Sequence, residues 1–219
     1  MLNLWTSRTS KIASFYYTNS VGQAGSSVTL GDYDTSLTSN IAYHNISVNN
    51  TWQLKLDDFG YRNQSYSNNT PGLQVAFGTG LPVIAGDTQL FSSLLAEFQA
   101  FDNCYNVDYL PNIYFTIGGI KYEVPPTIFY LHDETGVCSL LLMDNQTYNY
   151  NVSAETIFLG IPFIQTYYTI FDVENQRIGF APNSLPSPTP RPPNPLSAFR
   201  LEAIYNLVSL LLCIIYLVL

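Results

Sequence analysis

One stretch of the chain, Gly72–Asp87, constrains the fold more than any other. Two apolar runs, Leu73–Phe77 and Leu81–Ala85, flank the tight sequence Gly78-Thr79-Gly80. Val and Ile favour strands, and paired glycines allow a backbone turn that other residues resist. The stretch therefore predicts two buried strands joined by a sharp turn, and such a turn can present a side chain at the edge of a cleft.

The sequence on either side of this stretch predicts more strands and one helix. Leu90, Leu94, Leu95 and Phe98 follow a helical spacing within Thr88–Phe101, and Asp87 is a suitable N-cap. Tyr61–Thr70 is polar and rich in Asn and Ser, so we expect an exposed loop there. Strands are expected at Ser14–Tyr17, Ser26–Leu30 and Trp52–Asp57, with a hairpin and further strands between Tyr109 and Tyr130.

Further motifs resemble segments of one protein family. Leu110-Pro-Asn-Ile-Tyr-Phe-Thr-Ile-Gly-Gly119 is similar to its LPDITFTINGG. Phe158-Leu-Gly160 and the run from Tyr167 to Ala181, YYTIFDVENQRIGFA, are similar to its closing ILGD and YYTVFDRENNRIGFA. Ser14–Tyr17 and Gly25–Asp34 resemble its FSFYL and GSLTLGGYD. The family is that of the pepsin-like aspartic proteases, peptidase A1.

The resemblance implies a mostly β fold, a single lobe of the two-lobed pepsin-like acid protease fold with one or two short helices. Each lobe of that family supplies one catalytic Asp, and the matching segments here all belong to the second lobe. We therefore expect residues 14–182 to form a pepsin-like C-terminal lobe. Residues 1–13 would be an N-terminal segment outside the family.

The family's active-site motif is where this chain departs most from the resemblance. In the family, an apolar strand runs into Asp-Thr-Gly-Thr-Ser. One alignment places Ala76 at the Asp and Phe77 at the first Thr, and keeps Gly78. The other places Gly78 at the Asp, keeps Thr79-Gly80 and deletes two residues. Neither supplies a carboxylate, so we expect no catalytic residue in the degraded motif at Ala76, Phe77, Gly78, Thr79 and Gly80.

The chemistry of the family makes this departure decisive. Peptide hydrolysis there needs two carboxylates that share a proton and a water. The nearest carboxyl groups in the sequence are Asp57 and Asp58 before the turn and Asp87 after the next strand. The family's Leu-Gly-Asp also reads Leu-Gly160-Ile, where we expect Gly160 to pack against the turn. The resemblance thus implies an aspartic endopeptidase lobe that is catalytically inactive as this chain stands.

Two other functions stay open from the sequence. The chain could be a membrane-anchored pseudoprotease that binds a peptide or protein in a half-cleft or pairs with another lobe, or it could be a truncated gene product. No cofactor or metal is expected, because His44 and His132 lack a ligand pattern and fit surface loops. The formal net charge of −8 argues against nucleic acid, because the chain could not neutralise a run of phosphates.

Glycosylation and cysteine patterns point to a secretory compartment. N-x-Ser/Thr sequons occur at Asn45, Asn49, Asn63, Asn68, Asn145 and Asn151, all in polar stretches. The resemblance implies a disulfide between Cys104 and Cys138, and two buried free thiols are the alternative. Such a bridge would stabilise the fold by roughly 3–4 kcal/mol. Cys213, in the apolar tail, is expected to be unpaired.

The two ends of the chain predict membrane association without a leader. Met1–Ala13 has no apolar run of the length that a signal peptide needs. Residues 183–202 contain a Pro-rich stretch that predicts an extended stalk, and residues 203–219 form an apolar tail. The tail is either the signal for a lipid anchor or a short tail helix. We expect the lobe outside the cell or in the secretory lumen, beside a membrane.

Overall fold

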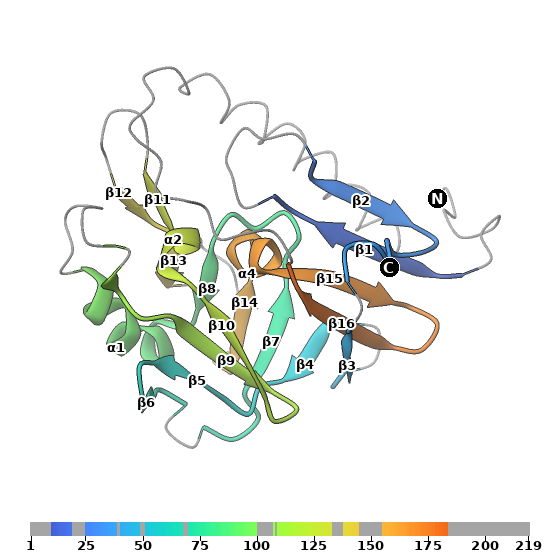
Figure 1. The fold of residues 1–219 in the computed structure, drawn as a ribbon. Helices are drawn as coiled ribbons and strands as arrows, with labels where there is room; N and C mark the ends of the chain where they lie inside the picture. Colours follow the sequence, from blue (N-terminus) through green and yellow to red (C-terminus); the bar gives the residue numbers. More distant parts are fainter. Residues whose placement is uncertain are drawn as a thin grey trace.

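The described part of the chain is mostly β, as the resemblance predicted. A computed structural model describes residues 10–18, 25–38, 40–48, 51–67, 70–99, 107, 109–132, 138–144 and 155–183. Within these ranges there are three helices, one more than expected: α1 (Thr88–Gln99), α2 (Pro126–Phe129) and α4 (Ile161–Thr166). Figure 1 shows them among twisted strands that make up most of the lobe.

The strands belong to four sheets. Their orders are β2-β1-β15-β16-β3, β10-β9-β5-β6, β11-β12 and β13-β8-β14-β7-β4. The strands are β1 (Ile12–Tyr16), β2 (Ser27–Leu30), β3 (Ala42–Asn45), β4 (Gln53–Lys55), β5 (Asp58–Tyr61), β6 (Gln64–Ser65), β7 (Gln74–Phe77), β8 (Ile84–Gly86), β9 (Ile113–Ile117), β10 (Ile120–Val124), β11 (Tyr130–His132), β12 (Cys138–Leu140), β13 (Leu142–Asp144), β14 (Thr156–Leu159), β15 (Tyr167–Asp172) and β16 (Arg177–Pro182).

The sheet that carries the Gly78–Gly80 turn mixes parallel and antiparallel pairs. β14 runs parallel to β7, with Leu159 opposite Phe77, and antiparallel to β8. β13 adds a parallel edge strand beside β8, and β4 an antiparallel one beside β7. Strands β7 and β14 point the same way and α4 lies just beyond them (Figure 1). Segments far apart in the sequence therefore meet where β7 ends.

The closing hairpin, β15 and β16, pairs over its whole length. Asp172 lies at its tip, 2% exposed, and accepts hydrogen bonds from Nε of Arg177 and Nδ2 of Asn175, both at 2.8 Å. Burial alone would raise the pKa of Asp172, but these hydrogen bonds hold that pKa below its usual range. Tyr167, at the start of the hairpin, both donates to the carbonyl of Glu123 and accepts from its amide, at 2.9 and 2.8 Å.

Aromatic rings make up much of the main core. Phe163 of α4 is fully buried and its ring lies 5.0 to 6.3 Å from those of Tyr167, Phe180 and Phe115. Phe91 and Leu94 of α1 are also fully buried, which agrees with the helical spacing in the sequence. A smaller cluster around Tyr16, Tyr168 and Ile170 lies apart from this core. Helix and sheets are thus joined mainly by packed rings.

Two sequence predictions need correction. The run Leu81–Ala85 is a strand only from Ile84, because the amide of Leu81 donates to the carbonyl of Gly78 and closes a turn instead. Tyr61–Thr70 is not wholly an exposed loop. Tyr61 ends β5, β6 follows, and Tyr66 is 3% exposed with its ring 6.4 Å from that of Phe59. A large aromatic in a polar stretch found a core position that composition alone did not predict.

The expected helix after the turn is present. α1 begins at Thr88, and the side chain of Asp87 accepts a hydrogen bond from the amide of Gln89 at 2.8 Å. The predicted N-cap therefore fills its role at the helix start. The predicted hairpin is formed by β9 and β10, joined by Gly118 and Gly119, which have φ of +57° and +76°. A two-residue turn with positive φ at both positions favours glycine.

Candidate functional site

The turn Gly78-Thr79-Gly80 follows directly on β7. The amide of Gly78 donates to the carbonyl of Leu159 at 3.1 Å, so the turn continues the pairing of β7 with β14. The carbonyl of Gly78 then accepts from the amide of Leu81 at 3.0 Å. A Cβ added at Gly78 would lie 2.9 Å from the Cβ of Leu81. The turn is therefore closed tightly around a residue without a side chain.

Gly160, between β14 and α4, lies against the other end of the turn. The amide of Ile161 donates to the carbonyl of Leu81 at 2.7 Å. A Cβ at Gly160 would lie only 2.2 Å from the carbonyl oxygens of Leu81 and Val83. Both neighbours are backbone atoms, which cannot turn aside as a side chain can. The approach between α4 and the turn therefore requires glycine at this position.

A tyrosine from β1's end holds the centre of the turn. The hydroxyl of Tyr17 donates to the carbonyl of Thr79 at 2.9 Å, and burial raises the pKa of Tyr17 to about 12. Thr79 is itself 5% exposed, and its hydroxyl has no hydrogen-bond partner among the described residues. The sequence predicted a strand at Tyr17 but gave no sign of this contact. The turn is thus fixed through backbone atoms by three separate segments.

The side chains of the degraded motif carry no acid or base. Ala76 is 7% exposed within β7. Phe77 is the last residue of β7, and its ring lies 5.2 Å from that of Phe180 and 5.8 Å from that of Phe163. It belongs to the aromatic core rather than to a reactive surface. Gly78 and Gly80 contribute only backbone, so the turn offers a shape and peptide groups but no titratable group.

The carboxylates nearest in the sequence are bound elsewhere. Asp57 accepts from the amide of Gly119 at 2.9 Å, and Asp58 accepts from the hydroxyl of Tyr114 at 3.0 Å. Asp87 caps α1, as described above. These three groups serve the β9–β10 hairpin, the β5–β9 pairing and the helix start. None of them is placed as a substitute for the missing acid of the motif.

The histidines do not form a metal site in the described part of the chain, where no three His, Cys, Asp or Glu side chains gather. His44 was expected on a loop but lies in β3, because its ring fills a space beneath the β9–β10 turn. Its Nε2 is 2.6 Å from the hydroxyl of Tyr122. Burial lowers the pKa of His44, against a smaller opposing effect of Asp57. His132 is in β11.

Other predicted sites are only partly within the described residues. Asn45 ends β3 and Asn63 lies in the turn between β5 and β6, and both are exposed. Asn49, Asn68, Asn145 and Asn151 lie outside, so those sequons stay predictions. Cys138 begins β12, whereas Cys104 and Cys213 lie outside, and the pairing of Cys104 with Cys138 stays a prediction.

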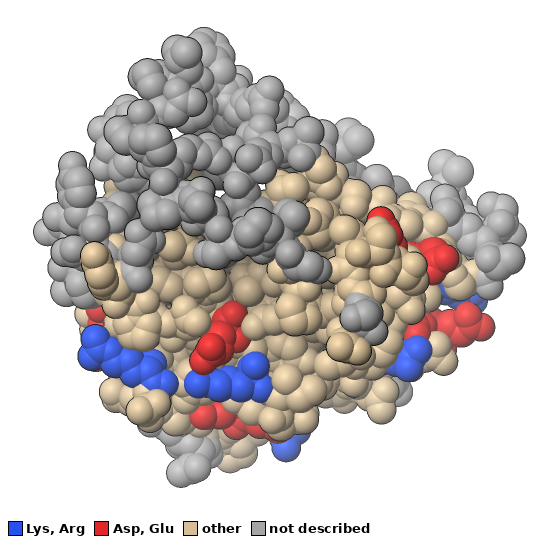
Figure 2. All heavy atoms as spheres, in the orientation of Figure 1, with Lys and Arg blue, Asp and Glu red and all other residues tan. Residues whose placement is uncertain are grey.

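The predicted stalk and tail, from residue 184 onward, also lie outside the described residues. Among the helices that the structure does describe, none has the length and apolar character needed to cross a bilayer. On the face shown in Figure 2, acidic and basic side chains alternate over a mostly uncharged surface. That face offers no broad basic patch of the kind that binds phosphate backbones.

Comparison with known proteins decides the family. A sequence model described as "Eukaryotic aspartyl protease" matches residues 6–183. The chain belongs to this family. Pepsin A of Bos taurus is 33% identical over 177 residues, which cover 76% of this chain and 46% of that protein. Pepsin A of Sus scrofa is 32% identical over 176 residues, with 76% and 44% covered.

Gastricsins are similar over the same extent. The gastricsin of Callithrix jacchus is 29% identical over 183 residues, covering 79% of this chain and 46% of that protein. The chain thus spans less than half the length of the relatives that it matches. Within this aspartyl protease family, the described fold corresponds to a single lobe. The closing hairpin and the turn after β7 are the two parts of that lobe that bear on activity.

Proposed function

We propose that this chain is the second lobe of a pepsin-like aspartic protease that has kept the active-site turn but supplies no catalytic carboxylate. The observation that carries the proposal is the turn itself. Its backbone is held by Leu159, Leu81 and Tyr17, yet Gly78 opens it without a side chain. Because β7 ends at Phe77, the alignment with Gly78 at the Asp position fits better than the one with Ala76 there.

The chemical consequence is the loss of one half of the acid–base pair. A dyad needs one carboxylate as base and one carboxylic acid, and mutual repulsion separates their pKa values. A hydrogen atom at Gly78 can neither take nor give a proton. Pairing with a first lobe would supply one carboxylate at most, so peptide hydrolysis by the family mechanism is not available to such a pair.

Binding is the function that such a lobe retains. A turn and strands that present backbone N–H and C=O groups can pair with an extended peptide without any catalytic side chain. We therefore assign the chain to a pseudoprotease that binds a peptide or protein, either alone or paired with another lobe. The sequons and the apolar tail support a place on a membrane in the secretory pathway or outside the cell.

The test is an acid-protease assay on the purified chain, run alongside a binding measurement. We expect no cleavage of an unfolded protein substrate between pH 2 and pH 6, together with saturable binding of the same substrate. Cleavage that is lost on substitution of a carboxylate in this chain would overturn the proposal. Absence of both cleavage and binding would favour a truncated gene product instead.

A further inference from the structure

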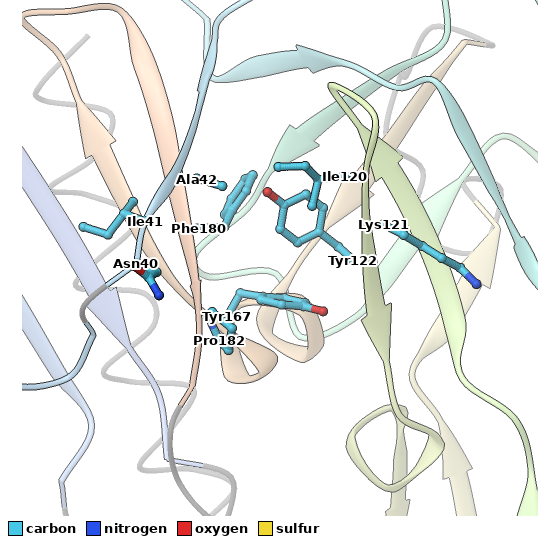
Figure 3. Close-up of a pocket in the computed structure, with 9 residues that line it drawn as sticks. All are labelled: Asn40, Ile41, Ala42, Ile120, Lys121, Tyr122, Tyr167, Phe180 and Pro182. Atoms are coloured by element: carbon cyan, nitrogen blue, oxygen red, sulfur yellow. The ribbon is translucent and has the colours of Figure 1, made fainter.

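A hollow of about 540 Å³ lies between the β9–β10 hairpin and the sheet of β3, β15 and β16. The rings of Tyr122, Tyr167 and Phe180 turn toward it (Figure 3). Ile120 forms part of its rim and is 44% exposed, which is unusual for a large apolar side chain in this lobe. The hollow is separate from the turn after β7 and has no role in the proposed function.

The aromatic walls of the hollow are fixed in place. The ring of Tyr122 lies 5.1 Å from that of Tyr167 and 5.2 Å from that of Phe180, both nearly edge to face. Tyr167 is held by its two hydrogen bonds to Glu123, and Tyr122 by its contact with His44. Little side-chain entropy remains to be lost when a ligand packs on these rings, which favours binding.

The hollow contains no charged group among the residues that line it, although Lys121 lies at its edge. The side chain of Lys121 points away from the hollow (Figure 3). Its Nζ is 3.1 Å from Glu123 and 4.3 Å from the centre of the Tyr114 ring. Asn40 is the other polar residue of the lining. An uncharged, apolar occupant therefore suits this surface better than a phosphate or a carboxylate.

The chain itself leaves the lobe at this hollow. Pro182 is part of the lining, and Asn183 is the last described residue. The side-chain amide of Asn183 donates to the carbonyls of Tyr17 and Gln165, at 2.8 and 3.0 Å. These bonds fix the exit of the chain beside the aromatic rings. The residues that follow begin their path within reach of Tyr167 and Phe180.

The next residues have the composition that aromatic grooves recognise. Prolines occupy positions 186, 188, 190, 192, 193 and 195, and Arg191 is the one charged residue from 184 to 199. Such a sequence favours the polyproline II helix, which advances about 3.1 Å per residue and binds grooves lined by aromatic side chains. Because this helix is already extended, it loses little entropy on docking. The covalent link also keeps its effective concentration high.

We propose that residues 184–196 turn back over Pro182 and dock as a polyproline II helix in the hollow formed by Ile120, Tyr122, Tyr167 and Phe180. The Pro-rich stretch then acts as a strap that sets the direction in which the tail leaves the lobe. A Pro-rich peptide of another molecule, or the same stretch of a second copy, would compete for the same rings.

The test measures binding of a fluorescent peptide with the sequence of residues 184–196 to the full chain in detergent. In one variant, the prolines of residues 186–195 are replaced by Ser, which leaves the hollow open. We expect this open variant to bind the peptide at least tenfold more tightly than the native chain, whose own strap competes. Adding Ile120→Asp to the open variant should weaken binding at least tenfold.

Val28→Asp in the open variant is the matched control, because Val28 is 37% exposed on β2 and does not line the hollow. It should leave peptide binding unchanged. Equal binding by the native chain and the open variant would overturn docking in cis and assign the hollow to a partner's peptide. A native chain that dimerises through its Pro-rich stretch would overturn it in favour of a second copy. No binding to any variant would refute the proposal.

Discussion

The turn after β7 and the hairpin β15–β16 have kept opposite things. The hairpin keeps its chemistry, because the buried carboxylate of Asp172 still has Arg177 and Asn175 as partners. The turn keeps its backbone contacts but has lost its acid. A framework held by glycine packing and main-chain hydrogen bonds can thus outlast the reactive side chain that it once presented. Structure and activity in this fold depend on different atoms.

The comparison breaks most severely if Gly160 is changed. Gly160→Ala places a methyl group 2.2 Å from two carbonyl oxygens, so the turn and α4 must separate. We expect a loss of at least about 3 kcal/mol in the free energy of unfolding, measured by urea denaturation. Gly72→Ala is the control, since nothing lies near that site. It should cost only the strain of its positive φ, about 1–2 kcal/mol. Equal losses would contradict the packing role of Gly160.

The hairpin should be the next most sensitive region. Arg177→Gln removes a hydrogen bond and a charge from a carboxylate that is 2% exposed, and we expect a cost of about 2–3 kcal/mol. Lys121→Gln, which breaks an exposed ion pair with Glu123, should cost under about 1 kcal/mol. Thermal unfolding at neutral pH compares the two. A smaller loss for Arg177→Gln than for Lys121→Gln would refute this ranking.

The same hairpin gives a pH prediction. Because the pKa of Asp172 is lowered in the folded state, its stabilising effect is complete above its unfolded pKa, about 3.9. The effect is lost as the pH falls through the lower, folded value. In Arg177→Gln the pKa of Asp172 rises, so the loss should begin at a higher pH. Urea midpoints from pH 2 to pH 7 would show it, and identical profiles would contradict it.

Restoring the acid sharpens the comparison at the turn. Gly78→Asp requires Leu81 to move, since a Cβ there lies 2.9 Å from that of Leu81, and we expect a cost of about 1–2 kcal/mol. Gly78→Ala introduces the same Cβ without the charge and is its control. Neither variant alone should cleave peptides, because a dyad needs a second carboxylate. Cleavage by isolated Gly78→Asp would contradict that reasoning.

The smallest effect is expected at Tyr17. Tyr17→Phe removes the hydrogen bond to the carbonyl of Thr79 and should cost about 0.5–1.5 kcal/mol. Tyr16→Phe, one residue earlier on the other face of β1, is the control and should leave the turn unaffected. Amide hydrogen exchange at Gly80 and Leu81 should quicken only in Tyr17→Phe. Equal exchange in both variants would show that the hydroxyl does not hold the turn.

Sequence patterns predicted the local elements of this lobe well. The α1 spacing and the Asp87 cap, the Gly118-Gly119 hairpin and the strands β7 and β15 could be predicted because their signals lie within a few residues. The burial of Tyr66 and the place of His44 in β3 could not, because both depend on partners far along the chain. The contact of Tyr17 with Thr79 joins residues that are 62 positions apart, and no local pattern reports it.

The hydroxyl of Tyr167 has a consequence for self-association. β10 is the edge of its sheet, and an edge strand with free peptide groups is a template on which other chains can aggregate. At Glu123 both the N–H and the C=O are taken by one tyrosine oxygen. A foreign strand would have to displace that oxygen before it could pair there. A single side chain from a neighbouring sheet thereby protects this edge in a lobe whose other half is absent.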